Sequence, residues 1–204
     1  MLKFNPISIG ILNSRKEYIN ECINSVTGQF YPNKFMELII VKNLDKEYKI
    51  GEGYNEIVKR SKNNWILFLG DDDMIARTYL FNVNAFLNHM QNKHLDSDIV
   101  AVVTHAILID ETRKISLDII PTGTWNRDFL IKNPFDEKLC KYVDSEMFAR
   151  TNSMIDKFII RDDTNYGYYY RQHSNNVSKN KFKEKTRILK EIEKKMKNQR
   201  IYAR

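Results

Sequence analysis

Three consecutive aspartates, Asp71, Asp72 and Asp73, directly follow the strongly apolar stretch WILFLG at residues 65–70. Like charges at this spacing repel one another, so the cluster is stable only where solvent, hydrogen-bond donors or a cation neutralises it. Carboxylates are ligands for divalent cations such as Mn²⁺ and Mg²⁺, and a bound cation in turn binds phosphate. The triplet therefore predicts a site where a divalent cation joins the protein to a phosphate-bearing ligand.

The segments around the aspartates alternate between strand-like and helix-like patterns. Short runs rich in Ile, Leu and Val predict buried strands at 7–12, 36–41, 65–70 and 98–110. Apolar residues at helical spacing predict helices at 15–26, 54–62 and 79–90. This order is typical of an α/β fold, in which a mostly parallel, Rossmann-like sheet has helices on both faces.

Ligands of open α/β sheets bind beyond the carboxyl ends of the strands. Three loops are expected at that edge: 13–15, 42–47 and 70–73. The sequence thus places the aspartates in a crevice that the loops after the first two strands also line.

Five segments, in this order along the chain, resemble family 2 glycosyltransferases of the GT-A fold over most of residues 6–178. The segments are PISIGILNSRKEYINECINSV, MELIIVKN, GYNEIVKRSKNNWILFLGDDD, NPFDEKLCKYVDSEMFAR and YYYRQHSNNVS. The resemblance implies an inverting, metal-dependent enzyme that transfers a hexose from a nucleotide sugar to an acceptor hydroxyl.

The resemblance also implies which residues hold the cation, Mn²⁺ or Mg²⁺. Asp71 and Asp73 match the ends of the family's Asp-x-Asp motif, where the first aspartate contacts the ribose and the last binds the metal. Asp73 is therefore the first choice of metal ligand, with His173 completing the metal site. Asp72 allows the motif to be read one residue later, so the choice within the triplet stays open.

Asp144 matches the family's general base, in the segment that Arg150 closes. An acceptor hydroxyl is a poor nucleophile near neutral pH, so a carboxylate must take its proton as it attacks. For the donor, the resemblance implies a pocket in which Gly123 and Trp125 line the sugar and the indole packs on the pyranose. The residues expected to bind the nucleotide sugar are Ile11, Asn13, Arg15, Asn43, Asn55, Asp71, Asp72, Gly123, Trp125 and Arg171.

A UDP-sugar is the expected donor, with glucose the favoured hexose. The family commonly has an acidic residue at the position of Lys42 or Asn43, where it contacts uracil, and this departure weakens the inference of uridine. The acceptor stays open between a glycan, a lipid-linked sugar, a protein and a modified nucleic acid.

The net charge of +7 is concentrated at the C-terminus. Residues 179–204 contain 11 Lys or Arg and 3 Glu, a balance of +8, whereas residues 1–178 contain 22 basic and 23 acidic side chains, a balance of −1. Within the tail Phe182, Leu189, Ile192 and Met196 share one helical face. We therefore expect a glycosyltransferase domain at 1–178 and a basic amphipathic helix at 179–204. The helix would pack on the body or on a second subunit of a homodimer, or would attract an anionic surface.

The other general features favour a cytoplasmic protein. No apolar tract reaches the roughly 18 residues of a membrane-spanning helix, and the N-terminal segment lacks the pattern of a signal peptide. Cys22 and Cys140 form neither a disulfide framework nor a metal-binding spacing.

Two other classes of function compete with the glycosyltransferase. An aspartate-nucleophile phosphatase also has an Asp-x-Asp motif after a strand, but that motif usually follows the first strand and continues differently from Met74 and Ile75. A non-enzymatic module that binds nucleic acid or a membrane surface would explain the basic tail. It would leave the three aspartates without a role.

Overall fold

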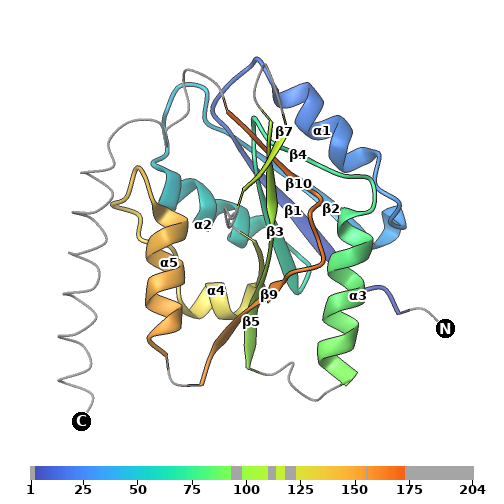
Figure 1. Ribbon diagram of the computed structural model, residues 1–204. Coiled ribbons are helices and arrows are strands. Elements are labelled where there is room, and N and C mark those ends of the chain that lie inside the picture. The colour runs from blue at the N-terminus through green and yellow to red at the C-terminus, as the bar shows by residue number, and fades with distance from the viewer. Residues whose placement is uncertain (1–2, 93–97, 110–113, 118–122, 155, 173–204) are drawn as a thin grey trace, which may run out of the picture.

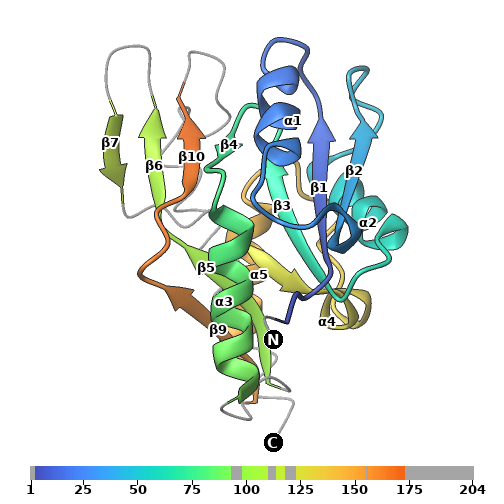
Figure 2. The ribbon, with the colours of Figure 1, turned by 90° about the vertical axis from the view of Figure 1, so that its right-hand side faces the viewer.

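A six-stranded sheet forms the centre of the molecule, in a computed structural model that describes residues 3–92, 98–109, 114–117, 123–154 and 156–172 (Figures 1 and 2). Its strand order is β2-β1-β3-β8-β5-β9. The strands are β1 (Ile7–Asn13), β2 (Met36–Lys42), β3 (Trp65–Gly70), β5 (Ile99–Thr104), β8 (Thr124–Asn126) and β9 (Phe158–Asp162). Only β8 runs against the other five, which confirms the predicted, mostly parallel α/β sheet.

Helices cover both faces of this sheet. Figure 1 shows α1 (Ile19–Thr27) and α3 (Tyr79–Asn92) on one side of it, and α2 (Ile50–Arg60), α4 (Arg127–Lys132) and α5 (Val143–Asn152) on the other. A short 3₁₀ helix, η1 (Asn33–Phe35), precedes β2. None of the described helices combines the length and hydropathy needed to cross a membrane.

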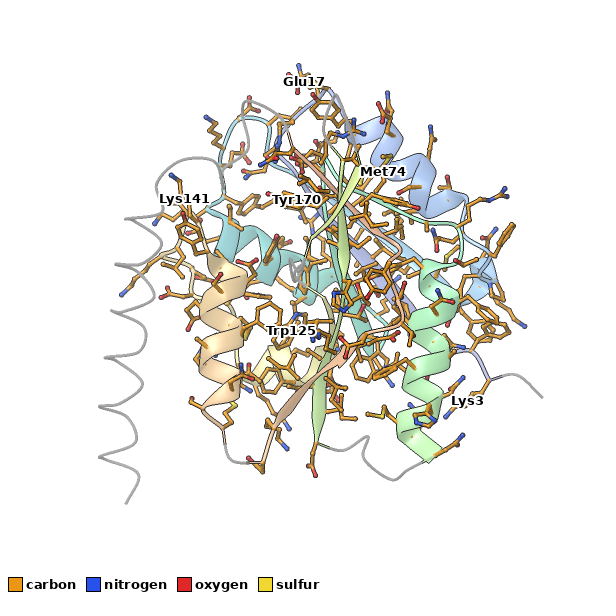
Figure 3. All side chains as sticks on the ribbon, viewed as in Figure 1. Lys3, Glu17, Met74, Trp125, Lys141 and Tyr170 are labelled. Atoms are coloured by element: carbon orange, nitrogen blue, oxygen red, sulfur yellow. The ribbon has the colours of Figure 1, made fainter. Side chains whose placement is uncertain are left out.

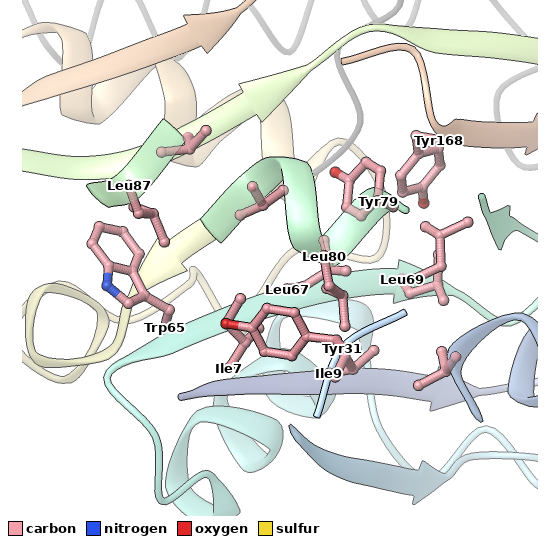
Figure 4. Close-up of a cluster of buried hydrophobic side chains, with 14 of the residues drawn as sticks. Ile7, Ile9, Tyr31, Trp65, Leu67, Leu69, Tyr79, Leu80, Leu87 and Tyr168 are labelled. Atoms are coloured by element: carbon pink, nitrogen blue, oxygen red, sulfur yellow. The ribbon is translucent and has the colours of Figure 1, made fainter. Parts of the chain in front are cut away.

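The two helix layers create two hydrophobic cores, and β3 contributes to both. Trp65, Leu67 and Leu69 belong to the core beneath α1 and α3, which Figure 4 shows in close-up, whereas Ile66 and Phe68 belong to the opposite core. Because successive side chains of a strand point to opposite faces, a strand that is covered on both faces is apolar throughout. This accounts for the unbroken WILFL run before the aspartates.

A second, smaller sheet has the order β4-β10-β6-β7. It contains β4 (Met74–Ile75), β6 (Ala106–Ile109), β7 (Lys114–Leu117) and β10 (Tyr168–Arg171). The prediction of a single strand at 98–110 is wrong. The chain leaves the six-stranded sheet at His105 and continues as β6 in the four-stranded sheet. β9 and β10 make the same change of sheet at 163–167, so two parallel strand pairs bend together.

The helix starts also differ from the predictions. α1 begins at Ile19 rather than at residue 15, because the Arg15 guanidinium contacts Asp71 and Asp72 and holds the preceding segment at the sheet edge. α2 begins four residues earlier than predicted, where Glu52 accepts a hydrogen bond of 2.7 Å from the Lys49 backbone N–H and caps the helix. The expected basic helix at 179–204, and the domain boundary before it, lie outside the described residues.

Candidate active site

The three aspartates form a tight turn at the carboxyl edge of the large sheet, directly after β3. The turn is closed by a 3.1 Å hydrogen bond from the Asp73 N–H to the Gly70 carbonyl, and all three side chains are buried. A Cβ atom at Gly70 would lie only 2.6 Å from Asp73 Oδ2. A side chain at this position would therefore displace the Asp73 carboxylate from its place in the turn.

Asp71 is held by the segment that follows β1. Its Oδ2 accepts hydrogen bonds from the Ser14 N–H at 2.6 Å and the Ser14 hydroxyl at 3.0 Å, and its Oδ1 lies 3.0 Å from Arg15 Nη2. Burial raises the pKa of Asp71, and the Arg15 charge works against that rise. Ser14 was not among the predicted site residues, although it lies between the predicted Asn13 and Arg15.

Asp72 shares the same arginine, because Arg15 Nη1 contacts its Oδ2. The Asp72 backbone carbonyl accepts a 2.9 Å hydrogen bond from Arg171 Nε. The Arg171 guanidinium also lies over the Tyr18 ring and contacts Glu21 at 2.5 Å, so it ties the start of α1 to the aspartate turn.

Asp73 is bound by β10 through both of its carboxylate oxygens. Oδ2 accepts a 2.7 Å hydrogen bond from the Tyr168 hydroxyl, and Oδ1 accepts one of 2.9 Å from the Arg171 N–H. Burial, and then the neighbouring Asp72 charge, raise the pKa of Asp73 to about 7. Tyr168 was not among the predicted site residues, although it begins the segment YYYRQHSNNVS, because its contact with Asp73 joins residues that are far apart in the chain.

The raised pKa of Asp73 predicts how stability depends on pH when metal is absent. The folded protein binds the proton up to about pH 7, whereas the unfolded chain releases it near pH 4. The free energy of unfolding should therefore fall as the pH rises from 5 to 8, by on the order of 2 to 3 kcal/mol. Urea unfolding in EDTA at both pH values measures this change. The Asp73→Asn variant should show a flatter dependence, and an equal slope in both proteins would contradict the assignment.

The two asparagines expected near the base differ in their contacts. Asn43 Oδ1 accepts a 2.8 Å hydrogen bond from the Tyr48 N–H, and Asn43 Nδ2 donates one of 3.0 Å to the Tyr48 carbonyl. Asn43 therefore stabilises the loop after β2. Because both ends of its amide are already bonded within that loop, these contacts do not favour the expected contact with the base. Asn13 Oδ1 is buried and has no hydrogen-bond partner among the described residues. An oxygen in that state is costly unless a ligand supplies the missing donor.

Two of the predicted sugar-nucleotide residues are core residues instead. Ile11 and Trp125 are both 0% exposed, and the Trp125 indole stacks on Phe129 and also contacts Phe148 in the core beneath α4 and α5. In Figure 3 Trp125 lies in the lower half of the molecule, well below Met74 and Tyr170. The prediction that the indole packs on a pyranose is wrong, because no face of the ring is open to a ligand.

Gly123 lies at the start of β8, where its φ of +84° favours glycine and its carbonyl accepts a hydrogen bond from the Phe68 N–H. It is buried, so its role in this structure is to join β8 to β3.

Asn55 connects α2 to the segment that leads into α5. Its Oδ1 accepts a 2.9 Å hydrogen bond from the Phe135 N–H, and its Nδ2 donates to the Phe135 carbonyl and to Glu137, both at 3.0 Å. The carboxamide is thus used by the protein itself. This contact positions residues that precede Asp144, rather than a nucleotide.

Replacing Asn55 by alanine should lower the free energy of unfolding by about 1 to 3 kcal/mol, because Phe135 loses two hydrogen bonds. Donor affinity should change little, while transfer to an acceptor should fall. Asn133→Ala is the matched control, since Asn133 Nδ2 donates to the Phe129 carbonyl in the helix just before it. A larger loss of nucleotide affinity than of transfer in Asn55→Ala would return Asn55 to the donor site.

Asp144 lies in the first turn of α5, and its Oδ1 accepts a 2.8 Å hydrogen bond from the Ser145 N–H. Figure 1 shows α5 beside α2, with its N-terminal end toward the edge where the parallel strands end. Arg150 pairs with Glu146 at 2.8 Å and donates to the Pro134 carbonyl, so it anchors the segment before α5. His173 lies outside the described residues.

The carboxylates fit a divalent ion that also binds the ligand's phosphates. Among the described residues no three His, Cys, Asp or Glu side chains form a metal-binding group. Mg²⁺ and similar ions are commonly held by one or two carboxylates, with substrate phosphates supplying further ligands. Both Asp73 oxygens already accept hydrogen bonds, whereas Asp72 faces the partly exposed Arg15, whose charge a metal ion can replace. Asp73 is thus tied to β10 through both oxygens, and Asp72 is paired with an arginine.

A cavity of about 430 Å³ lies over the outer side of α2. Its lining includes four glutamates, Glu47, Glu52, Glu56 and Glu137, with Lys59 as the lone basic side chain among the lining residues. This charge does not suit a diphosphate, so the aspartate turn remains the better candidate site.

Comparison with solved structures identifies this arrangement of sheets and helices. The chain is similar to S. aureus TarS residues 1–349 in complex with UDP-GlcNAc, with a TM-score of 0.66 and 16% identity over 86% of this chain and 61% of that one. It is also similar to the mannosyltransferase PcManGT from Pyrobaculum calidifontis in complex with GDP-Man and Mn²⁺. The TM-score is 0.62 and the identity 12%, over 85% of this chain and 59% of that one. The chain thus spans about three fifths of each. No protein-family model matches it, and no curated protein does. The likeness confirms the expected GT-A-like fold.

Proposed function

We propose that the protein is a glycosyltransferase that uses a divalent metal and a nucleoside diphosphate sugar. The observation that carries this proposal is the buried aspartate turn at the carboxyl edge of a GT-A-like sheet. Structures of the same fold are bound to UDP-GlcNAc in one protein and to GDP-Man and Mn²⁺ in another, which supports a sugar nucleotide as the ligand here.

Asp72 would hold the metal, with Asp71 and Arg15 beside it. When bound, the metal supplies positive charge to the diphosphate leaving group. The protein contributes a preorganised turn, since Ser14, Tyr168 and the Arg171 backbone fix the carboxylates before any ligand arrives. Arg15 would be released from the carboxylates and become a second cation for the phosphates.

Asp144 would act as general base toward the acceptor hydroxyl, giving an inverting transfer. A UDP-hexose, with glucose favoured, remains our proposal for the donor. The phosphatase alternative is not favoured, because both oxygens of Asp71 are engaged by Ser14 and Arg15 and the turn follows the third strand.

Asn13 would recognise the base, because its buried Oδ1 lacks a donor that a pyrimidine or purine ring N–H supplies. Asn13→Leu keeps the approximate size of the side chain and removes the acceptor. It should weaken UDP binding by about tenfold, the loss expected for a buried hydrogen bond. Calorimetry with UDP and with inorganic pyrophosphate, both with Mn²⁺, separates base from phosphate recognition. Equal losses for the two ligands would remove Asn13 from the base site.

A donor screen tests the proposed function. UDP-, GDP- and TDP-hexoses are each incubated with the protein, Mn²⁺ or Mg²⁺, and a mixture of sugar, lipid-linked sugar, protein and nucleic-acid acceptors. Release of the nucleoside diphosphate is measured, and we expect turnover of one donor class that stops in EDTA. Absence of turnover with every donor and metal would count against the proposal.

A further inference from the structure

A second group of side chains gathers where the two sheets meet, in the bend at His105 and 163–167. The Tyr166 ring stacks on the His105 imidazole, with ring centres 4.6 Å apart and planes inclined by 8°. Asp163 Oδ1 lies 2.9 Å from His105 Nε2 and 2.5 Å from Arg161 Nε. The His105 backbone N–H also donates to the Asn165 backbone carbonyl, which ties the end of β5 to the 163–167 loop. The aspartate turn uses none of these side chains, so they form a separate group that we call the bend cluster.

The bend cluster combines a rigid aromatic surface with polar groups that are open to solvent. Tyr166 is 46% exposed although one face of its ring is covered by His105, so the opposite face is available. The Asp163 side chain is 63% exposed, and both of its ion pairs use Oδ1. Oδ2 therefore remains able to accept hydrogen bonds from a ligand, and the half-exposed Arg161 guanidinium lies next to it.

Strand alternation places Arg161 of the bend cluster on the side of the sheet that α5 covers. In β9, Ile160 packs in the core beneath α1 and α3 and Ile159 in the core beneath α4 and α5. Arg161 continues the Ile159 side. In β5, Thr104 points to the other side, where its hydroxyl meets Tyr79 of α3, and His105 follows it. Arg161, the member of the bend cluster that lies within β9, thus shares a side of the sheet with α5, which carries Asp144.

The bend cluster is also close to the aspartate turn. It lies at the carboxyl ends of β5 and β9, two and three strands away from β3, which corresponds to roughly 10 to 15 Å. Tyr166 is two residues before Tyr168, whose hydroxyl binds Asp73, and the Ala76 N–H donates to the intervening Gly167 carbonyl. A ligand on Tyr166 would therefore be a neighbour of a sugar donor at the aspartates, rather than part of it.

We propose that the bend cluster is the subsite for a carbohydrate acceptor, an inference that rests on the proposed function. The open face of Tyr166 stacks on the apolar face of a pyranose, as aromatic rings do with flat apolar surfaces. Asp163 Oδ2 and Arg161 bind the hydroxyls at the edge of that sugar, because a carboxylate accepts and a guanidinium donates charge-assisted hydrogen bonds. The acceptor class is thus a neutral glycan. His105 positions Tyr166 and Asp163 without touching the sugar.

The test measures saccharide binding with no nucleotide and with metal removed by EDTA. Glucose, galactose, mannose, N-acetylglucosamine and their β-linked disaccharides are titrated against the intact protein by saturation-transfer NMR. We expect at least one of them to bind, and Tyr166→Ala to weaken it by about fivefold to tenfold, the range for one aromatic contact. Tyr166→Phe and Tyr166→Trp should retain binding, because stacking needs only the ring.

Two control variants are matched to the bend cluster. Phe30→Ala removes another exposed aromatic side chain, and Asp156→Ala removes another exposed carboxylate that is paired with a neighbouring lysine. Neither variant should change the affinity for the saccharide, whereas Asp163→Ala should lower that affinity as Tyr166→Ala does. The proposal is overturned if no saccharide binds the intact protein, or if the control variants lose as much affinity as the bend-cluster variants. Because the assay contains no donor, saccharide binding with no nucleotide binding would contradict only the proposed function.

Discussion

Replacing Asp144 by asparagine is expected to reduce sugar transfer by about 10²- to 10⁴-fold, the usual contribution of a general base. Asparagine has nearly the same shape but cannot take the acceptor proton. Its carbonyl oxygen can still accept the hydrogen bond from the Ser145 N–H, so the start of α5 should be unchanged. Donor affinity should therefore stay within about twofold, since no direct contact with the donor is lost.

Asp128→Asn is the matched control for this experiment. Asp128 is an exposed carboxylate in the first turn of α4, so its removal changes a helix N-terminus in the same way without touching α5. The measurement is initial rate against acceptor concentration, together with donor affinity by calorimetry, for the three proteins. Transfer that survives in Asp144→Asn within a factor of a few would mean that another group removes the proton.

Replacing Asp72 by asparagine is expected to remove the metal-dependent part of nucleotide affinity. The variant loses the negative charge that a divalent cation needs, while its side chain can still contact Arg15. We expect Mn²⁺ to strengthen UDP or GDP binding by at least about tenfold in the intact protein and to have little effect on the variant, as for loss of a metal ligand.

Asp73→Asn distinguishes the two readings of the aspartate triplet. The Asp73 carboxylate accepts hydrogen bonds from the Tyr168 hydroxyl and the Arg171 N–H. Asparagine disturbs this pair of hydrogen bonds, but we expect only a small loss of folding stability above neutral pH. The variant should keep a response to Mn²⁺. If Asp73→Asn loses that response and Asp72→Asn keeps it, Asp73 is the metal ligand, as the usual reading of the motif suggests.

The strands and the edge at which the aspartates lie could be predicted from sequence, because apolar runs covered on both faces leave a clear pattern. The run WILFLG, with side chains in two cores, is the best example. The change of sheet at His105 could not be predicted, since residues 98–110 continue an apolar pattern and only the pairing of β6 with β10 separates the two strands.

The roles of polar side chains were predicted less well, because their partners come from distant segments. Asn43 and Asn55 have residue types suited to a nucleotide, but their amide groups are bonded to Tyr48 and Phe135. Trp125 suits a sugar pocket by type, yet β8 is placed between β3 and β5 and its indole enters the core. A resemblance in sequence identifies the loop, whereas packing decides which side chains in it face a ligand.

The most direct test of the central claim is a calorimetric titration of UDP and of GDP into the intact protein, in Mn²⁺ and again in EDTA. The account predicts one-site binding of at least one nucleotide in Mn²⁺, a large loss of affinity in EDTA, and competition by the corresponding sugar nucleotide. Binding of neither nucleotide in Mn²⁺, or the same affinity in EDTA as in Mn²⁺, would contradict a metal-dependent nucleotide-sugar site at the three aspartates.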